Sequence, residues 1–142
     1  VADVLLGLVF TALLVGETVA DQQQWRFQNW KLAERAAGRE PEMRFLQTGL
    51  FRFSRHPNFF FEQAQWWVIF LFGAVAAGSL LQWTVLGAVL LTTLFIGSTV
   101  FTERISLSRY PEYARYQKTT SALVPWKPRK GSGAVLAEHP GV

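Results

Sequence analysis

Residues 63–102 read QAQWWVIFLFGAVAAGSLLQWTVLGAVLLTTLFIGSTVFT and contain no Lys, Arg, Asp, Glu or His. One membrane-spanning helix needs about 20 predominantly apolar residues, so this stretch has room for two spans and a tight turn. Gly78 and Ser79 mark the turn, and Pro57 fits the first turn of a helix. The sequence therefore predicts a helical hairpin in a membrane, with spans over residues 57–77 and 81–102.

A further span precedes the hairpin. Residues 4–20 are apolar apart from two threonines and Glu17, and good helix formers continue to residue 37. Gly38 and Pro41 then supply stop signals. A helix over residues 4–37 would be about 50 Å long, against about 30 Å of hydrocarbon, so it should extend into water or bend near Gly16.

Beyond the hairpin, residues 111–118 predict a short polar helix, and residues 128–142 have the composition of a flexible tail. The expected fold class is all-α. It is a polytopic transmembrane helical bundle with three spans over residues 1–127 and a short C-terminal cytoplasmic helix. The chain begins with Val1 rather than Met, so we expect further helices of the same polytopic protein N-terminal to it.

The 14 Lys and Arg residues fall in two stretches, 26–55 and 104–130. The hairpin returns the chain to the side that it left, so both stretches share one side of the membrane. The positive-inside rule makes that side cytoplasmic, and we expect an integral protein of a bacterial inner membrane. The net charge of +4 then reflects topology, and no nucleic acid is expected as a partner.

Several classes of site are excluded by composition. The chain has no Cys and two His, which leaves no metal site built on these ligands and no disulfide framework. The glycine spacings form neither G-x-G-x-x-G nor a P-loop. Any cofactor site must therefore use polar side chains near the membrane surface.

The first group of such side chains forms one face of the first helix. Glu17 and Asp21 are like charges four residues apart, which costs about 0.2–0.5 kcal/mol even in water. Ionisable groups near a bilayer usually face a cavity or a partner. An ordinary solvated helix end is the alternative, and it explains the basic residues better than Glu17. The face consists of Glu17, Asp21, Gln24, Gln28, Lys31 and Arg35.

The second group surrounds the start of the helix at Pro57. Arg55 and His56 precede a helix N-terminus, where unpaired N–H groups and a partial positive charge make an anion site. Asn58 and Glu62 are four residues apart and share a face. The alternative is positive-inside basicity beside a capped helix.

The third group follows the hairpin and holds Arg104 and all three tyrosines, Tyr110, Tyr113 and Tyr116. The phenols can form a wall of a ligand site or an aromatic belt at the interface. Together the three groups offer carboxylates, amides, guanidinium groups and phenols. That set suits a large, anionic, polar cofactor on the basic side and a lipophilic substrate that enters from the bilayer.

Three motifs in the chain occur together in a known family. They are Glu17-x-x-x-Asp21-x-Gln23 with Phe27, residues 49–59 (GLFRFSRHPNF) followed by Glu62 and Trp66-Trp67, and Glu103-x-x-Ser106-Leu107-x-x-Tyr110-Pro111-x-Tyr113-x-x-Tyr116. This pattern, over about residues 10–127, resembles the DUF1295 proteins of the steroid 5-alpha-reductase-like superfamily of membrane oxidoreductases.

The resemblance implies an NADPH-dependent reductase of a carbon–carbon double bond in a lipophilic, steroid- or lipid-like substrate. The substrate-side residues of the superfamily lie on earlier helices, so the catalytic residues stay unassigned and this segment alone should be inactive. Steroid reductases carry an Arg where this chain has Gln28, which leaves the phosphate contacts open. By position, the implied cofactor contacts are Glu17, Asp21, Arg55, His56, Asn58, Glu62, Arg104, Tyr110, Tyr113 and Tyr116.

Two other functions stay open. Isoprenylcysteine and phospholipid methyltransferases, which bind S-adenosylmethionine, also carry Arg-His-Pro before a membrane helix and a Glu followed by Tyr residues. The Glu17/Asp21 pair and residues 106–116 look more like those of the reductases. The third possibility is a membrane scaffold whose basic loops bind anionic lipid. Lipid binding would follow total charge, whereas a cofactor site would depend on Asn58 and Glu62.

Overall fold

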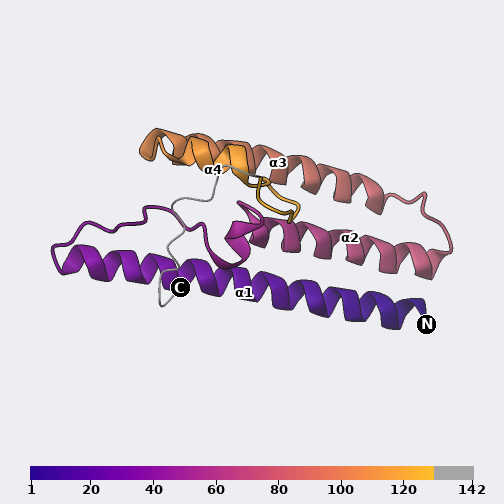
Figure 1. Ribbon diagram of the computed structural model, residues 1–142. Helices are drawn as coiled ribbons and strands as arrows, with labels where there is room; N and C mark the ends of the chain where they lie inside the picture. Colours follow the sequence, from indigo (N-terminus) through magenta and orange to yellow (C-terminus); the bar gives the residue numbers. More distant parts are fainter. Residues whose placement is uncertain (130–142) are drawn as a thin grey trace.

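The computed structural model describes residues 1–129, and this part of the chain is helical apart from connections and one isolated bridge (Figure 1). The all-α prediction is therefore confirmed. Only the first two residues of the predicted tail, Pro128 and Arg129, fall within the described residues. The elements in order are α1 (Ala2–Ala36), the 3-10 helix η1 (Gly49–Arg52), α2 (Pro57–Ala77), α3 (Thr84–Arg109) and α4 (Tyr113–Thr119).

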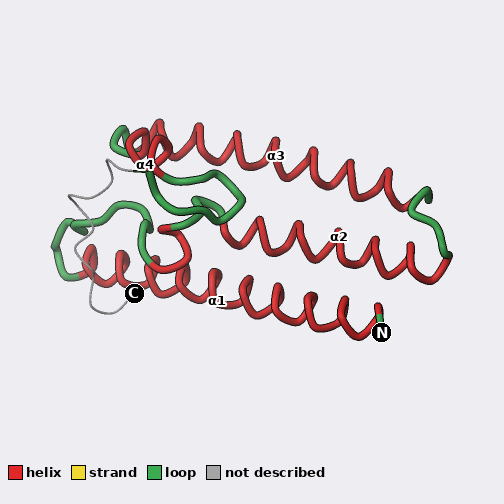
Figure 2. The backbone as a smooth tube through the Cα atoms, turned by 45° about the vertical axis from the view of Figure 1, so that its right-hand side comes forward, coloured by secondary structure: helices red, strands yellow, loops and turns green. Residues whose placement is uncertain are grey.

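The three long helices run side by side, with α2 between α1 and α3 (Figures 1 and 2). Each is long and apolar enough to cross a membrane. The 21 residues of α2 span about 31 Å, close to the thickness of the hydrocarbon layer. The predicted hairpin is α2 and α3, and Pro57 is the first residue of α2 as expected.

The first helix is continuous through Gly16 and far longer than one span. Its 35 residues extend about 52 Å, so about 20 Å lies beyond the hydrocarbon layer. Gly16 does not bend α1 but allows another helix to pack closely against it. A Cβ at this position would lie 2.6 Å from the ring of Phe61, so the missing side chain lets α2 approach α1.

The predicted bounds of the last two helices, 81–102 and 111–118, are wrong. Before α3, two hydrogen bonds to Ser79 stabilise the turn. Its hydroxyl oxygen accepts one from the N–H of Leu81, and its carbonyl oxygen accepts one from the side-chain amide of Gln82. At its other end α3 continues through polar residues to Arg109, because polarity ends a membrane span without breaking a helix. Pro111 then lies in a turn closed by the bond from the N–H of Tyr113 to the carbonyl of Tyr110, so α4 begins at Tyr113.

The connections at the basic end fold into a compact layer, which we call the cap and define as residues 37–56 and 110–129. Phe51 and Leu46 of the cap are buried against Phe27 and Ala20 of α1. The N–H of Leu50 donates to the side-chain oxygen of Gln23, 3.0 Å away. This small core attaches the cap to the part of α1 that extends past the membrane, and it was not apparent from the hydropathy pattern.

Candidate functional site

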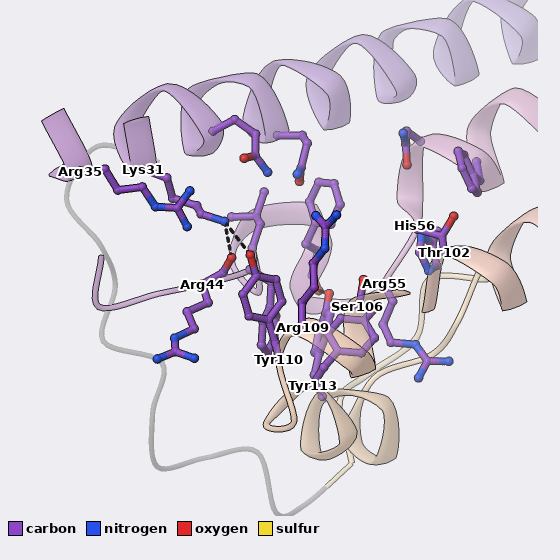
Figure 3. Close-up of a pocket in the computed structure, with 18 residues that line it drawn as sticks. Lys31, Arg35, Arg44, Arg55, His56, Thr102, Ser106, Arg109, Tyr110 and Tyr113 are labelled. Atoms are coloured by element: carbon purple, nitrogen blue, oxygen red, sulfur yellow. Dashed lines mark hydrogen bonds between the residues drawn. The ribbon is translucent and has the colours of Figure 1, made fainter. Parts of the chain in front are cut away.

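A cavity of about 440 Å³ lies between the extended end of α1, the cap and the last turns of α3 (Figure 3). No Asp or Glu is among the described residues that line it. We call it the basic cavity. Its titratable nitrogen-bearing residues come from α1, the cap and α3, and they are Lys31, Arg35, Arg44, Arg55, His56 and Arg109.

These basic side chains differ in whether they form hydrogen bonds or ion pairs with the rest of the protein. The Lys31 ammonium donates to the carbonyl of Arg44 at 2.6 Å and to the Tyr110 hydroxyl at 3.4 Å, and it lies 5.3 Å from the centre of the Tyr110 ring. Within residues 1–129, the side chains of Arg35 and Arg109 form no hydrogen bond or ion pair. Figure 3 shows Arg109 reaching from α3 toward α1, with Arg35 near Lys31. Two guanidinium groups are thus available to a ligand.

Glu103 of α3 fixes the other side of the cavity. Its Oε1 atom lies 3.0 Å from Arg55 Nε and 3.1 Å from His56 Nε2, while its Oε2 atom accepts the Gln117 amide at 3.0 Å. The contact between Arg55 and Glu103 is an ion pair only, because the Arg55 Nε–H group is not aligned for a hydrogen bond to the carboxylate. All three side chains of the Arg55–His56–Glu103 group are 10–12% exposed. A nearly buried carboxylate therefore holds the start of α2, α3 and α4 together.

The backbone around Arg55 and His56 is positioned by the chain after α4. The N–H of Arg55 donates to the carbonyl of Ser121 at 2.8 Å, and the N–H of His56 donates to that of Ala122 at 3.1 Å. These bonds surround the isolated parallel bridge between Ser54 and Ser121. Pro57 begins α2 directly afterwards. The pairing of residues 54–56 with the chain after α4 therefore also fixes the position of Asn58 in the cavity wall.

An aromatic group forms the cap side of the cavity. Phe45 packs on all three tyrosines, at ring-centre distances of 6.0 Å to Tyr110, 5.0 Å to Tyr113 and 5.6 Å to Tyr116. Burial raises the pKa of the Tyr113 and Tyr116 phenols well above the usual value near 10. Both phenols are therefore neutral at physiological pH. The Tyr116 hydroxyl donates to the carbonyl of Phe51, and so supports the wall.

The structure brings six of the ten predicted cofactor residues together at the basic cavity. The remaining four, Glu17, Asp21, Glu62 and Arg104, are outside its lining. Arg104 is exposed on α3. The six that line the cavity are Arg55, His56, Asn58, Tyr110, Tyr113 and Tyr116.

The three carboxylates form a second cluster between α1 and α2. Glu17 Oε2 accepts a hydrogen bond from the Gln65 amide at 2.5 Å, and Glu62 is close enough to Glu17 and to Asp21 to be repelled by both. Asp21 is one turn before Gln24 on α1, and Glu62 is one turn after Asn58 on α2, so the cluster continues the cavity toward the membrane. In the described part of the chain, no group of three or more His, Asp or Glu has the arrangement of a metal site.

Sequence reasoning did not select several lining residues as cofactor contacts. Lys31 and Arg35 were recognised only as members of the helix face, and their helical spacing was the signal. Arg44 and Arg109 lie in the two basic stretches without a spacing that singles them out, so only the fold identifies them. The other polar lining residues outside the selection are Gln24, Gln28, Thr102 and Ser106.

Comparisons with known proteins identify a family and one curated relative. The family described as "Protein of unknown function (DUF1295)" matches residues 1–120. An uncharacterized protein of Schizosaccharomyces pombe is 39% identical over 131 residues, covering 82% of this chain and 37% of the yeast protein. The chain thus corresponds to about a third of the length of that relative. No solved structure matches the chain.

Proposed function

The chain belongs to the DUF1295 family, and from this premise we propose that it forms the cofactor-binding part of an NADPH-dependent membrane reductase. The substrate is a lipophilic molecule with a reducible carbon–carbon double bond. One observation carries the proposal. The basic cavity has five Lys and Arg side chains and no carboxylate in its lining, and two of its arginines have no partner among the described residues.

The chemistry of NADPH fits this lining. Its pyrophosphate and its 2′-phosphate are anions, and an arginine guanidinium binds phosphate oxygens through a planar fork of donors. We assign phosphate binding to Arg35 and Arg109, supported by Lys31 and Arg44. The cavity volume of about 440 Å³ lies in the range of small-molecule sites. When bound, the cofactor supplies the hydride.

The remaining lining residues suit the uncharged parts of the dinucleotide. The rings of Phe45 and Tyr110 offer a surface on which a base can stack. Asn58 carries an amide that can bond hydroxyl groups of a ribose. Asp21 and Glu62, one helical turn nearer the membrane, carry carboxylates of the kind that accept hydrogen bonds from ribose hydroxyls. The substrate-side catalytic residues would come from further helices of the same polytopic protein.

Electrostatics favour NADPH over S-adenosylmethionine. S-adenosylmethionine carries a sulfonium, an ammonium and one carboxylate, with a net charge of about +1, whereas NADPH carries several negative phosphate charges, so a cavity whose charged lining is basic attracts NADPH more strongly. The reductase is therefore preferred to the methyltransferase. The proposed topology places the basic side in the cytoplasm, where nicotinamide nucleotides are available.

The test is ligand binding by the intact protein in detergent. NADPH and S-adenosylmethionine are offered separately, and thermal stabilisation is measured. A ligand at 100 times its dissociation constant adds about 2.7 kcal/mol to stability. We expect stabilisation by NADPH alone. Stabilisation by S-adenosylmethionine alone would transfer the protein to the methyltransferases, and stabilisation by neither would remove the proposal.

Variants then locate the site. The double variant Arg35→Gln/Arg109→Gln should weaken NADPH binding about a hundredfold or more, because two charge-assisted contacts are lost. The matched control is Arg26→Gln/Arg52→Gln, which removes the same charge from exposed residues outside the cavity lining. Equal losses in both variants would show a general charge effect and would contradict the assignment.

A further inference from the structure

A second cavity, of about 360 Å³, lies on the other side of Arg55. It is formed mainly by the end of α4 and the chain after it, so we call it the C-terminal cavity. Its basic residues are Arg55, Lys118, Lys127 and Arg129, and Thr119, Thr120 and Ser121 are also in its lining. No Asp or Glu is among the described residues that line it. Like the basic cavity, it is suited to an anion.

The backbone gives this cavity a fixed shape. The N–H of Arg129 donates to the carbonyl of Thr119 at 2.8 Å, which closes the chain after α4 into a loop. Arg55 is committed to Glu103. The side chains of Lys118, Lys127 and Arg129 form no hydrogen bond or ion pair with other described residues. Within residues 1–129, these three cations therefore have no competing partner for a ligand.

The position of the cavity relative to the membrane identifies the source of the anion. The N–H of Trp126 donates to the carbonyl of Phe53 at 3.0 Å, and Phe53 lies shortly before Pro57. Because α2 matches the hydrocarbon layer in length, its first residue lies near the boundary and Phe53 lies at headgroup level. Trp126 is 73% exposed and Phe53 41% exposed, and they form a shallow apolar groove with Pro125 and Lys127.

Exposed aromatic rings beside free cations at this depth are the features of a lipid interface. Tryptophan is enriched at headgroup level, where its ring is partly apolar and partly polar. Each Lys or Arg near an anionic membrane surface contributes about 1 kcal/mol of attraction. A soluble anion would use the cations but would leave the rings of Trp126 and Phe53 in water.

We propose that the C-terminal cavity binds the phosphate headgroup of an anionic phospholipid from the leaflet on the basic side. Lys118, Lys127 and Arg129 contact the headgroup, and Trp126 lies in the interface beside the acyl chains. This site does not depend on the proposed reductase activity. It differs from general attraction to lipid because it requires three particular cations rather than the total charge.

The experiment uses the intact protein in detergent and short-chain phosphatidylglycerol as the probe. Thermal stabilisation is measured against lipid concentration, with short-chain phosphatidylcholine and inorganic phosphate as the other two probes. We expect stabilisation by phosphatidylglycerol only. The variant Lys118→Gln/Lys127→Gln/Arg129→Gln should weaken phosphatidylglycerol binding about tenfold or more. The control variant, Arg26→Gln/Arg52→Gln/Arg115→Gln, loses the same charge from exposed residues outside both cavities.

Three results would overturn the proposal. Equal weakening in the two triple variants would mean that total charge attracts the lipid. Equal stabilisation by inorganic phosphate would make the cavity a site for a soluble anion. Loss of the lipid effect in Arg35→Gln/Arg109→Gln would place the lipid in the basic cavity. NADPH binding by the triple variant keeps the two proposals separate, since it should be retained if the cavities bind different ligands.

Discussion

Glu103 and Thr92 both lie on α3, and each brings together side chains from other elements. Glu103 accepts Gln117 and pairs with Arg55 and His56 at the basic end. In the middle of the bundle, the Thr92 hydroxyl accepts Gln63 Nε2 at 2.8 Å and Trp67 Nε1 at 3.0 Å, and donates to the carbonyl of Ala88. The two side chains have similar numbers of partners and very different surroundings.

The difference shows where polar contacts hold this protein together. Thr92 joins two helices that already pack through Phe70, Ala74 and Ala88, and its contacts are neutral. Glu103 joins the start of α2, α3 and α4 through a charged side chain, and its charge is compensated by Arg55 and His56. Removing one partner of a buried charge pair leaves the other charge uncompensated. The cap should therefore be far more sensitive to single polar substitutions than the bundle.

The largest effect is expected from Glu103→Ala. It leaves Arg55 without its counter-ion in a site that is nearly buried, so the free energy of unfolding should fall by about 3–5 kcal/mol. Denaturation of the intact protein in detergent measures this change. The control is Glu112→Ala, which removes a contact of 3.8 Å between half-exposed side chains and should cost less than about 1 kcal/mol. Similar losses in the two variants would contradict the role given to Glu103.

The cap and the turn at the far end of the bundle each contain a glycine with a positive φ. Gly49 and Gly78 have φ values of 62° and 68°, which cost other residues about 1–2 kcal/mol. A Cβ at Gly49 would also lie 2.6 Å from the Gln23 amide, whereas open space surrounds Gly78. Gly49→Ala should thus destabilise by about 2–3 kcal/mol and Gly78→Ala by about 1 kcal/mol, measured by the same denaturation. Equal costs would mean that Gln23 moves aside freely.

The same contrast explains what could be predicted from sequence. The spans followed from hydropathy, and the start of α2 followed from Pro57, because these signals are local and lipid imposes them directly. The cap depends on contacts between residues far apart in the chain, such as Gln23 with Leu50 and Arg55 with Ser121. No local pattern encodes such pairs.

The candidate site was predictable to a similar extent. Arg55, His56 and Asn58 were found because they flank the start of α2, and that start was recognisable. Arg109 was missed because no local spacing singles it out, and only the fold brings it to the cavity. The sequence pattern grouped Glu17 with Lys31 and Arg35 on one helical face, and Glu62 with Asn58 on another. The fold separates them because a face that is continuous along a helix meets different neighbours at different depths.

A smaller effect is expected from Tyr116→Phe in the cap. The variant keeps the ring on Phe45 but leaves the carbonyl of Phe51 without its donor, which should cost about 1 kcal/mol of unfolding free energy. The ring packing should be unchanged, so near-ultraviolet circular dichroism should keep its native form. A loss of that signal would mean that the hydroxyl determines the fold of the cap rather than adding to its stability.

The buried phenols also predict a dependence on pH. Burial raises the pKa of Tyr113 and of Tyr116 in the folded state, so folding favours the neutral form. The contribution of the neutral phenols to the free energy of unfolding is therefore complete below the unfolded-state pKa of about 10. This contribution is lost as the pH rises above that value. The free energy of unfolding should decline above pH 10, and it should decline less steeply in Tyr116→Phe. An identical slope in the variant would show that Tyr116 does not contribute.

The smallest effect is expected from Thr92→Val in the bundle. The substitution preserves shape and removes the acceptor shared by Gln63 and Trp67. Hydrogen bonds between helices in a membrane contribute about 0.6 kcal/mol on average, because the unfolded chain in the membrane also finds partners for these groups. We therefore expect a loss of about 1 kcal/mol or less on denaturation in detergent. A loss as large as that of Glu103→Ala would mean that Thr92 fixes the alignment of α2 and α3, and the cap would then no longer be the more sensitive region.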